Sequence, residues 1–425
     1  MFKKKHPWYT RRGYLHFDRP IDFRTAQSIV SSPEKIAKRS FHPFIDFELS
    51  TEKVKKNPLS KKLEKIPKVR PIAYASHLDS HIYSYYSYSL SKRYEESIGE
   101  LALGSSVLAF RALNKSNIEF AFDAFAEIQK RDTCHVLCLD IEGFFNNLNH
   151  EALKQAWTNV LKKENLPPDH FAVFKSLTKH SRVNRDELYE LFKISKNNPK
   201  NGIERICSPD EFRARVRKNG LIKVNAVPHG IPQGSPISAL LSNIYMMSFD
   251  VTVKAFVEEI GGCYLRYCDD MLLIVPIEHK NSLSVFVDQE IKKIKLTIQS
   301  SKTESRDFIR VNGVLVTSKP LQYLGFLFDG DRVLLRSASL ARYSERMKKG
   351  VRVAKATMAK RNAARLSRGE SEKPLFKKSL YKRYSYLGRR NFVSYGYRAA
   401  RIMNSKSIRR QLDGLWKRLH QEIAV

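Results

Sequence analysis

Two short apolar runs separated by a pair of acidic residues stand in the second half of the chain. Residues 263–268 and 271–276 are rich in Tyr, Leu, Ile and Val, and Asp269 and Asp270 lie between them. This pattern predicts a β-hairpin with the acidic residues at its tip. Adjacent carboxylates repel each other, and either solvent around an exposed turn or bound divalent cations would relieve that repulsion. The acidic pair alone leaves both interpretations open.

A second apolar run ends on a carboxylate. Residues 134–139 are almost wholly apolar, which predicts a buried central strand, and Asp140 follows directly. A carboxylate at the end of a buried strand is costly unless something compensates its charge. In an antiparallel sheet Asp140 can lie beside Asp269 and Asp270, and three carboxylates form an all-oxygen site suited to Mg²⁺ or Mn²⁺. Two such cations could activate a hydroxyl and stabilise a leaving phosphate, so the hypothesis is nucleotidyl transfer.

Hydrophobic periodicity predicts most of the remaining elements. A basic linker is expected near 51–68, and a strand is expected to begin at Arg70. Two helices and a loop are expected within residues 170–224. Asn149 is the predicted N-cap of a helix, and two Gly and three Pro between 228 and 236 predict a loop whose backbone approaches a ligand closely. The other expected helices cover 77–96, 116–130, 150–162, 237–258, 279–295 and most of 331–425, and the other expected strands cover 296–303 and 321–328.

Charge is distributed unevenly along the chain. The 425 residues carry a formal net charge of +33. Residues 1–70 contain 18 Lys and Arg against 7 Asp and Glu, and residues 331–425 contain 26 against 6, so the middle is nearly neutral. Two basic ends suit a polyanion held from both sides, because Lys and Arg replace the counterions condensed on phosphates. A generally basic surface would not explain the neutral middle, so we favour a nucleic acid partner.

Other features of the composition narrow the class of protein. No stretch reaches about 18 consecutive apolar residues, and no apolar signal core follows the basic start, so we expect an intracellular, cytoplasmic protein with no membrane partner. The five cysteines lack paired C-x-x-C spacing, which favours reduced thiols over zinc. Trp8, Tyr9, Tyr14 and Phe17 stand among basic residues, which suits either stacking on a single strand or a packed N-terminal cap.

Three motifs in order resemble the palm of reverse transcriptases. Residues 139–145 (LDIEGFF) resemble the first palm motif of that family, residues 230–238 (GIPQGSPIS) the second, and residues 267–270 (YCDD) the third. Their order and spacing also match. Three weaker similarities are the lysine motif at Lys302 and Thr303, the primer grip at 323–326 (YLGF) and the fingers motif at 70–72 (RPI). The resemblance covers about residues 66–330.

The resemblance assigns roles to individual residues. It implies that Asp140 and Asp269 bind two Mg²⁺ ions, or Mn²⁺, with Asp270 assisting. Phe145 stands where the family places a steric gate against a 2′-hydroxyl, which favours dNTPs. The resemblance also implies that Gln233 and Gly234 line the nucleotide pocket and that Arg70 binds the triphosphate. Lys302 would protonate the leaving pyrophosphate, and the primer grip would be formed by Tyr323, Leu324 and Gly325.

The resemblance also implies an α+β right-hand polymerase. Fingers are expected from about 66 to 135 and near 160–225, an antiparallel ferredoxin-like sheet in the palm, and a basic helical thumb from about 331. The expected divisions are a basic N-terminal extension over 1–65, fingers and palm over 66–330, and the thumb region over 331–425.

Among reverse transcriptases, the chain looks most like the bacterial defence-associated "unknown group", class 2, which is related to retron and group II intron enzymes. This similarity implies an antiphage role and a noncoding RNA, encoded nearby, that serves as template and scaffold for a cDNA. Asn146 and Asn147 stand where many members have an acid, and Cys268 stands where Ala is common. Two alternatives stay open: untemplated or protein-primed DNA synthesis on the same palm, and a non-catalytic RNA-binding module. Protein partners and oligomeric state leave no signal in the sequence.

Overall fold

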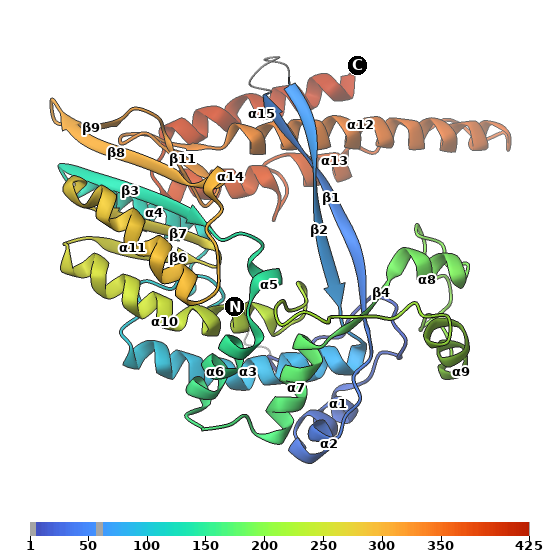
Figure 1. The fold of residues 1–425 in the computed structure, drawn as a ribbon. Coiled ribbons are helices and arrows are strands. Elements are labelled where there is room, and N and C mark those ends of the chain that lie inside the picture. The colour runs from blue at the N-terminus through green and yellow to red at the C-terminus, as the bar shows by residue number, and fades with distance from the viewer. Residues whose placement is uncertain (1–5, 57–62, 425) are drawn as a thin grey trace.

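The chain folds around a five-stranded antiparallel sheet that corresponds to the predicted palm (Figure 1). The computed structural model describes residues 6–56 and 63–424. The strand order is β6-β7-β3-β8-β9, and each neighbouring pair is antiparallel. These strands are β3 (Thr133–Asp140), β6 (Cys263–Tyr267), β7 (Asp270–Val275), β8 (Glu304–Val311) and β9 (Val314–Thr317).

The central strands are continuously apolar because both faces of the sheet are covered. Leu137 and Leu273 lie in a core with α3, α6, α10 and α11, whereas Val136 and Leu272 lie in a second core with α4 and the thumb helices. The predicted helices here are confirmed, and Asn149 caps α6 by accepting the Ala152 N–H at 3.1 Å. The bounds are α3 (His77–Glu100), α4 (Asn117–Gln129), α5 (Phe144–Asn147), α6 (His150–Leu161), α10 (Ser238–Glu259), η2 (Ile277–His279) and α11 (Lys280–Lys293).

The segment predicted as a basic linker forms a long hairpin instead. β1 (Phe44–Lys56) pairs with β2 (Leu63–Tyr74) from Ile45–Tyr74 to Lys56–Leu63, so the linker prediction over 51–68 is wrong for the described residues. Arg70 lies within β2 rather than at its start, and the expected boundary at residue 65 falls inside the same strand. Around Leu49 and Val69 the hairpin is solvated on both faces, so this part lacks the apolar alternation of a half-buried strand.

The hairpin joins a second sheet whose order is β2-β1-β4-β5. Residues 170–224 were expected to hold two helices and a loop, and the two short strands there were missed, because strands of four and two residues give no measurable periodicity. The elements of this region are α7 (Pro168–Thr178), β4 (Ser181–Asn184), α8 (Arg185–Leu191), α9 (Pro209–Glu211), the π-helical turn η1 (Phe212–Arg217) and β5 (Lys223–Val224).

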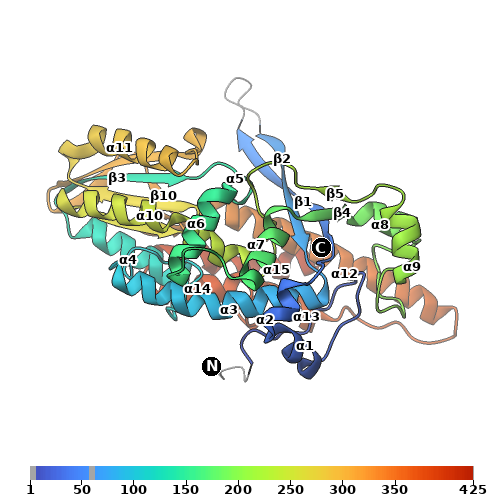
Figure 2. The ribbon, with the colours of Figure 1, turned by 60° about the horizontal axis from the view of Figure 1, so that its bottom comes forward.

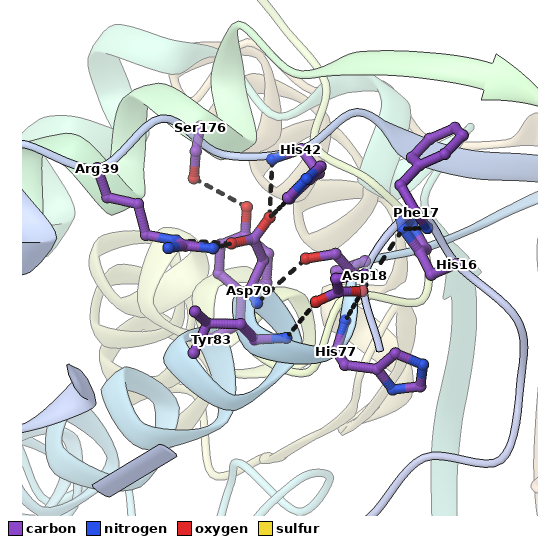
Figure 3. Close-up of polar contacts among 12 residues, drawn as sticks. His16, Phe17, Asp18, Arg39, His42, His77, Asp79, Tyr83 and Ser176 are labelled. Carbon is purple, nitrogen blue, oxygen red and sulfur yellow. Dashed lines mark hydrogen bonds and ion pairs between the residues drawn. The ribbon is translucent and has the colours of Figure 1, made fainter. Parts of the chain in front are cut away.

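The N-terminal segment packs onto the start of α3 (Figure 3). The Asp18 carboxylate accepts the backbone N–H groups of His77 and Leu78 at 2.9 Å each, where the helix leaves them unpaired. Buried Asp79 accepts Arg39 Nε at 2.9 Å and the His42 N–H at 2.8 Å. Trp8 and Phe17 are buried, so the described part of the N-terminus is a packed cap. Its helices are α1 (Phe23–Val30) and α2 (Pro33–Ala37).

The strand expected over 296–303 is absent from the described chain. Residues 296–299 are irregular apart from a bridge between Ile298 and Ile141, and the short turn η3 (Ser300–Lys302) precedes β8. The strand expected over 321–328 is split by a tight turn at Leu324 and Gly325. A three-stranded antiparallel sheet results, formed by β10 (Leu321–Tyr323), β11 (Phe326–Phe328) and β12 (Val333–Leu335).

The predicted basic helical thumb follows β12. α12 projects well beyond the rest of the thumb in Figure 1 and in the turned view of Figure 2. Its buried positions are few, and Tyr343, Met347 and Val351 form one stripe along it. The thumb helices are α12 (Ser337–Leu366), α13 (Lys377–Tyr384), α14 (Phe392–Ile402) and α15 (Lys406–Ala424).

Two expectations from composition can be compared with the structure. None of the described helices is both long and apolar enough to pass through a bilayer. All five cysteines are free thiols, and four of them are buried. Burial raises the pKa of the Cys268 thiol, which therefore stays protonated and packs as a small apolar group.

Candidate active site

Asp140 and Asp270 face each other across two neighbouring strands. Asp140 ends β3, Asp270 begins β7, and the two residues are direct partners in the antiparallel register. Asp269 lies in the two-residue turn between β6 and β7, directly after Cys268, which has a φ of 63°. The three predicted carboxylates therefore share one end of the palm sheet.

Burial and the neighbouring charges change the protonation of Asp270. Desolvation first, and then the charges of Asp269 and Asp140, raise the pKa of Asp270 to about 7. The nearby cations of Lys302 and Arg336 oppose the shift without cancelling it. Asp270 is still reached by solvent, so its carboxyl can exchange a proton for a cation from solution.

Lys302 binds directly to the first carboxylate. Its Nζ donates a hydrogen bond to Oδ2 of Asp140. The turn that carries it is fixed to the same strand end, because the Gln299 N–H donates to the Asp140 carbonyl at 2.8 Å. A side chain predicted to protonate pyrophosphate is thus held at the carboxylates, and its role as an acid stays a prediction.

A pocket of about 430 Å³ opens beside the carboxylates. Asp140, Asp270 and Lys302 line one part of it, and the predicted primer-grip residues Tyr323, Leu324 and Gly325 line another. Leu324 has a φ of 45°, a left-handed conformation that non-glycine residues rarely adopt. Asn117 on α4 holds this strained turn by donating to the Leu324 carbonyl at 3.0 Å.

Four further pocket residues were missed by sequence reasoning: Asn117, Glu304, Gln322 and Arg336. Arg336 is one of 26 Lys and Arg residues between 331 and 425, so composition could not single it out. Glu304 pairs with Arg306 at 3.0 Å and accepts the Gln322 N–H at 3.3 Å. Its position depends on β8, a strand that the sequence did not predict.

The loop rich in Gly and Pro connects the palm to the fingers. The Gln233 carbonyl accepts the Ala73 N–H of β2 at 2.9 Å. Gly234 has a φ of 120°, and a Cβ there would lie 2.5 Å from the Ala73 carbonyl oxygen. Only glycine fits at this crossing. Gln233 and Gly234 do not line the 430 Å³ pocket, and their role in binding the nucleotide stays a prediction.

Phe145 and Arg70 also lie outside that pocket. Phe145 is half-buried on α5, its ring 5.6 Å from that of Phe144, and its carbonyl accepts the Ile231 N–H at 2.9 Å. The predicted gate is thereby attached to the loop that carries Gln233. Arg70 is exposed on β2 opposite Leu49.

The carboxylates can be tested against the divalent ions that their chemistry suggests. Across residues 6–56 and 63–424, no three acidic, His or Cys side chains are gathered around one point as metal ligands. The donor set nevertheless fits hard cations, because the available ligands are carboxylate oxygens close enough to raise the pKa of Asp270. A cation that binds Oδ2 of Asp140 must displace the Lys302 ammonium.

Residues 54–328 match the family described as reverse transcriptase (RNA-dependent DNA polymerase). This chain belongs to the reverse transcriptase family. The match covers more than half of the chain and identifies an RNA-dependent DNA polymerase, which is a nucleotidyltransferase. Reverse transcriptases generally use divalent metal ions, in agreement with the all-carboxylate site.

Solved telomerase structures are similar to this reverse transcriptase at low identity. Apo telomerase from Candida tropicalis is 13% identical with a TM-score of 0.42, over 95% of this chain and 62% of that chain. Telomerase from Candida albicans in complex with a TWJ fragment of telomeric RNA is 11% identical with a TM-score of 0.40, over 94% of this chain and 66% of that chain. The reverse transcriptase thus spans less than two thirds of the length of these telomerase chains.

The two asparagines that depart from the first palm motif have structural contacts in this reverse transcriptase. Asn147 Nδ2 donates to the Glu142 carbonyl at 2.8 Å, and the Asn146 carbonyl accepts from His229 Nδ1 at 2.8 Å. The bond from His229 joins α5 to the second-motif loop, whereas the bond of Asn147 closes the turn before α5. Only the contact of Asn147 uses its side chain, because the group that Asn146 supplies is a backbone carbonyl.

Proposed function

We propose that this reverse transcriptase copies a noncoding RNA into cDNA from dNTPs, using Asp140, Asp269 and Asp270. The observation that carries the proposal is the register of β3 and β7, which sets Asp140 opposite Asp270 beside a pocket that the primer-grip residues also line. A non-catalytic RNA-binding module has no use for mutually repelling carboxylates at a strand end.

The proposed mechanism assigns each residue a task. Asp140 and Asp269 would hold two Mg²⁺ ions, or Mn²⁺, and Asp270, ionised above about pH 7, would assist them. Such ions would supply activation of the primer hydroxyl and neutralisation of charge on the phosphates. Lys302, once released from Asp140, would be available to protonate pyrophosphate. Arg70 binds the triphosphate, and Gln233 and Gly234 hold the nucleotide.

Sequencing the RNA and DNA that co-purify with the protein tests the proposal. The expected result is one abundant RNA and DNA complementary to it. DNA without a complementary RNA would point to untemplated synthesis, and DNA covalently attached to the protein would point to protein priming. Either result would contradict the proposed copying of an RNA.

Phe145→Ala is expected to admit ribonucleotides. Loss of the ring removes the steric conflict with a 2′-hydroxyl, and discrimination of this size is worth roughly 1–3 kcal/mol, or about 10- to 200-fold in relative kcat/KM. Primer extension with paired rNTPs and dNTPs measures it. Phe145→Tyr keeps the ring and is expected to keep the selectivity. Unchanged selectivity in Phe145→Ala would remove Phe145 from the gate role.

RNA binding is expected to become weaker and less dependent on salt when alanine replaces Arg346, Lys349 and Arg352 together. All three are exposed on α12. Each lost phosphate contact lowers the slope of log K against log salt by roughly 0.7–0.9. Filter binding at several salt concentrations gives the slope. The matched control replaces Lys292 and Lys293 at the end of α11 and Lys295 just beyond it, and should leave the slope unchanged. Equal slopes in both variants would exclude α12 as an RNA contact.

We also propose that the enzyme acts in antiphage defence in the bacterial cytoplasm, with the noncoding RNA as template and scaffold. The resemblance of the chain as a whole to defence-associated reverse transcriptases supports this role. Plating phage on bacteria that express the protein with its flanking DNA tests it. Protection that requires the palm carboxylates is expected, and protection that survives their removal would contradict an enzymatic role in defence.

A further inference from the structure

A fully buried ion pair contacts the turn formed by Cys268 and Asp269, here called the catalytic turn. Arg266 on β6 and Asp250 on α10 both have side chains that are 0% exposed. Arg266 Nε and Nη2 donate to the two oxygens of Asp250 at 2.7 and 2.6 Å, a bidentate pairing. The Tyr264 hydroxyl donates to the same carboxylate at 2.7 Å. The pair is therefore fully hydrogen-bonded on the carboxylate side.

The remaining guanidinium nitrogen reaches the catalytic turn itself. Arg266 Nη1 donates to the Cys268 carbonyl at 3.0 Å and to Asn243 Oδ1 at 3.1 Å. Cys268, with its φ of 63°, occupies a conformation that costs a non-glycine residue about 1–3 kcal/mol. Its carbonyl belongs to the peptide bond that leads into Asp269. Arg266 thus fixes the strained turn at the residue directly before Asp269.

Stability alone does not account for this network. A fully buried ion pair is often no more stabilising than apolar side chains of similar volume, because both charges lose their hydration. An apolar residue at position 266 could not bond the Cys268 carbonyl, whereas the planar guanidinium serves Asp250 and the turn at the same time. What distinguishes Arg266 from an apolar replacement is therefore the control of the turn.

The network also connects the turn to the loop that carries Gln233 and Gly234. Asn243 and Asp250 are seven residues apart and lie on the same face of α10, which begins just after Gln233 and Gly234. The amide of Asn243 is held in turn, because its Nδ2 donates to the Ala109 carbonyl at 2.9 Å. One rigid helix thus links the loop that meets β2 with the turn that carries Asp269.

We propose that Arg266 is a positioning residue that holds Asp269 and Asp270 in register with Asp140, while Asp250 and Asn243 fix its guanidinium. Mg²⁺ demands near-ideal octahedral geometry, so a turn that relaxes by a fraction of an ångström should raise the requirement for the ion. The inference rests on the proposed polymerase function, and its test includes measurements that need no DNA synthesis.

The main variant combines Arg266→Met, Asp250→Leu and Tyr264→Phe. It removes both buried charges and the hydroxyl that would lose its acceptor, so that no unpaired charge remains in the core. The expected melting temperature lies within about 5 °C of the wild type, because such replacements are often neutral. The expected kcat is about 10- to 100-fold lower, the cost of a misplacement near 1 Å, with unchanged KM for dNTPs and unchanged RNA affinity.

Two readouts report on the turn without catalysis. Hydrogen–deuterium exchange of a peptide spanning 264–274 should be faster in the variant, and electron paramagnetic resonance should show weaker Mn²⁺ binding in the absence of RNA and dNTPs. A folded variant with wild-type kcat, Mg²⁺ requirement and exchange would overturn the proposal. If the wild type makes no DNA, the proposed function fails, whereas exchange and Mn²⁺ binding still decide the role of Arg266.

Arg266→Lys provides a second test of the proposal if the triple variant does not fold. Lys keeps the charge opposite Asp250, but a single ammonium cannot reproduce the fork that bonds Asp250 and the Cys268 carbonyl together. A kcat reduced at least 10-fold with preserved RNA affinity supports positioning, and a wild-type kcat overturns it. The matched control is Arg39→Met with Asp79→Leu, a largely buried pair at the start of α3 (Figure 3) that should alter stability without altering kcat or exchange at 264–274.

Discussion

Replacing both Asp269 and Asp270 with alanine is expected to lower DNA synthesis by roughly 10³-fold or more while RNA binding is retained. Metal ligation supplies several kcal/mol of stabilisation to the transition state, and each 1.36 kcal/mol changes the rate tenfold. RNA binding depends on cations outside the turn, so its affinity should not fall. Primer extension and filter binding on the same preparation measure the two properties.

The same double variant should also keep its thermal stability at pH 8. The pKa of Asp270 is raised to about 7 in the folded chain, so ionised Asp270 opposes folding, and the stability it contributes at low pH is lost as pH rises toward 7. Removing it should leave the melting temperature at pH 8 unchanged or higher in metal-free buffer. Asp210→Ala, at an exposed acid in a different region, is the control for loss of charge. Full DNA synthesis by the double variant would contradict the assigned site.

Gly234→Ala is the second substitution with a large expected effect. The added Cβ would meet the Ala73 carbonyl oxygen at 2.5 Å, and the φ of 120° is strained for any residue with a side chain. Backbone strain of this kind costs about 1–3 kcal/mol, and the loop must shift away from β2 to relieve it. We expect a lower melting temperature and a KM for dNTPs raised at least tenfold.

Gly202→Ala is the matched control for that substitution. Gly202 has a φ of 82°, but no atom lies within 4 Å of the position its Cβ would occupy. It therefore reproduces the strain of a positive φ without the collision with a neighbouring strand. Equal losses in the two variants would mean that the contact between Gly234 and Ala73 has no special role in nucleotide binding.

The central part of the site was accessible from sequence because its signals are local and strong. The apolar strands on either side of Asp269 and Asp270, and the apolar strand ending at Asp140, predict a buried sheet with acids at one end. The register of β3 and β7 confirms that prediction. The long helices were also predicted, since many turns of one apolar stripe leave a clear period.

The errors occur where local pattern carries little information. Part of the hairpin of β1 and β2 was interpreted as a linker, because strands that are solvated on both faces, as they are around Leu49 and Val69, show no apolar alternation. The primer-grip segment was predicted as one strand, although its turn depends on Asn117 bonding the Leu324 carbonyl across 207 residues of chain. No local rule predicts a contact of that kind.

The sequence by itself determined three apolar strands with acids at their ends, and it predicted that these acids carry the chemistry of this reverse transcriptase. Only the tertiary structure decided how these residues are held. It placed Lys302 on Asp140 and Arg266 under the Cys268 carbonyl. The physical reason is range, because apolar periodicity is set by neighbours along the chain, whereas a buried cation is positioned by partners that meet only when the whole palm has packed.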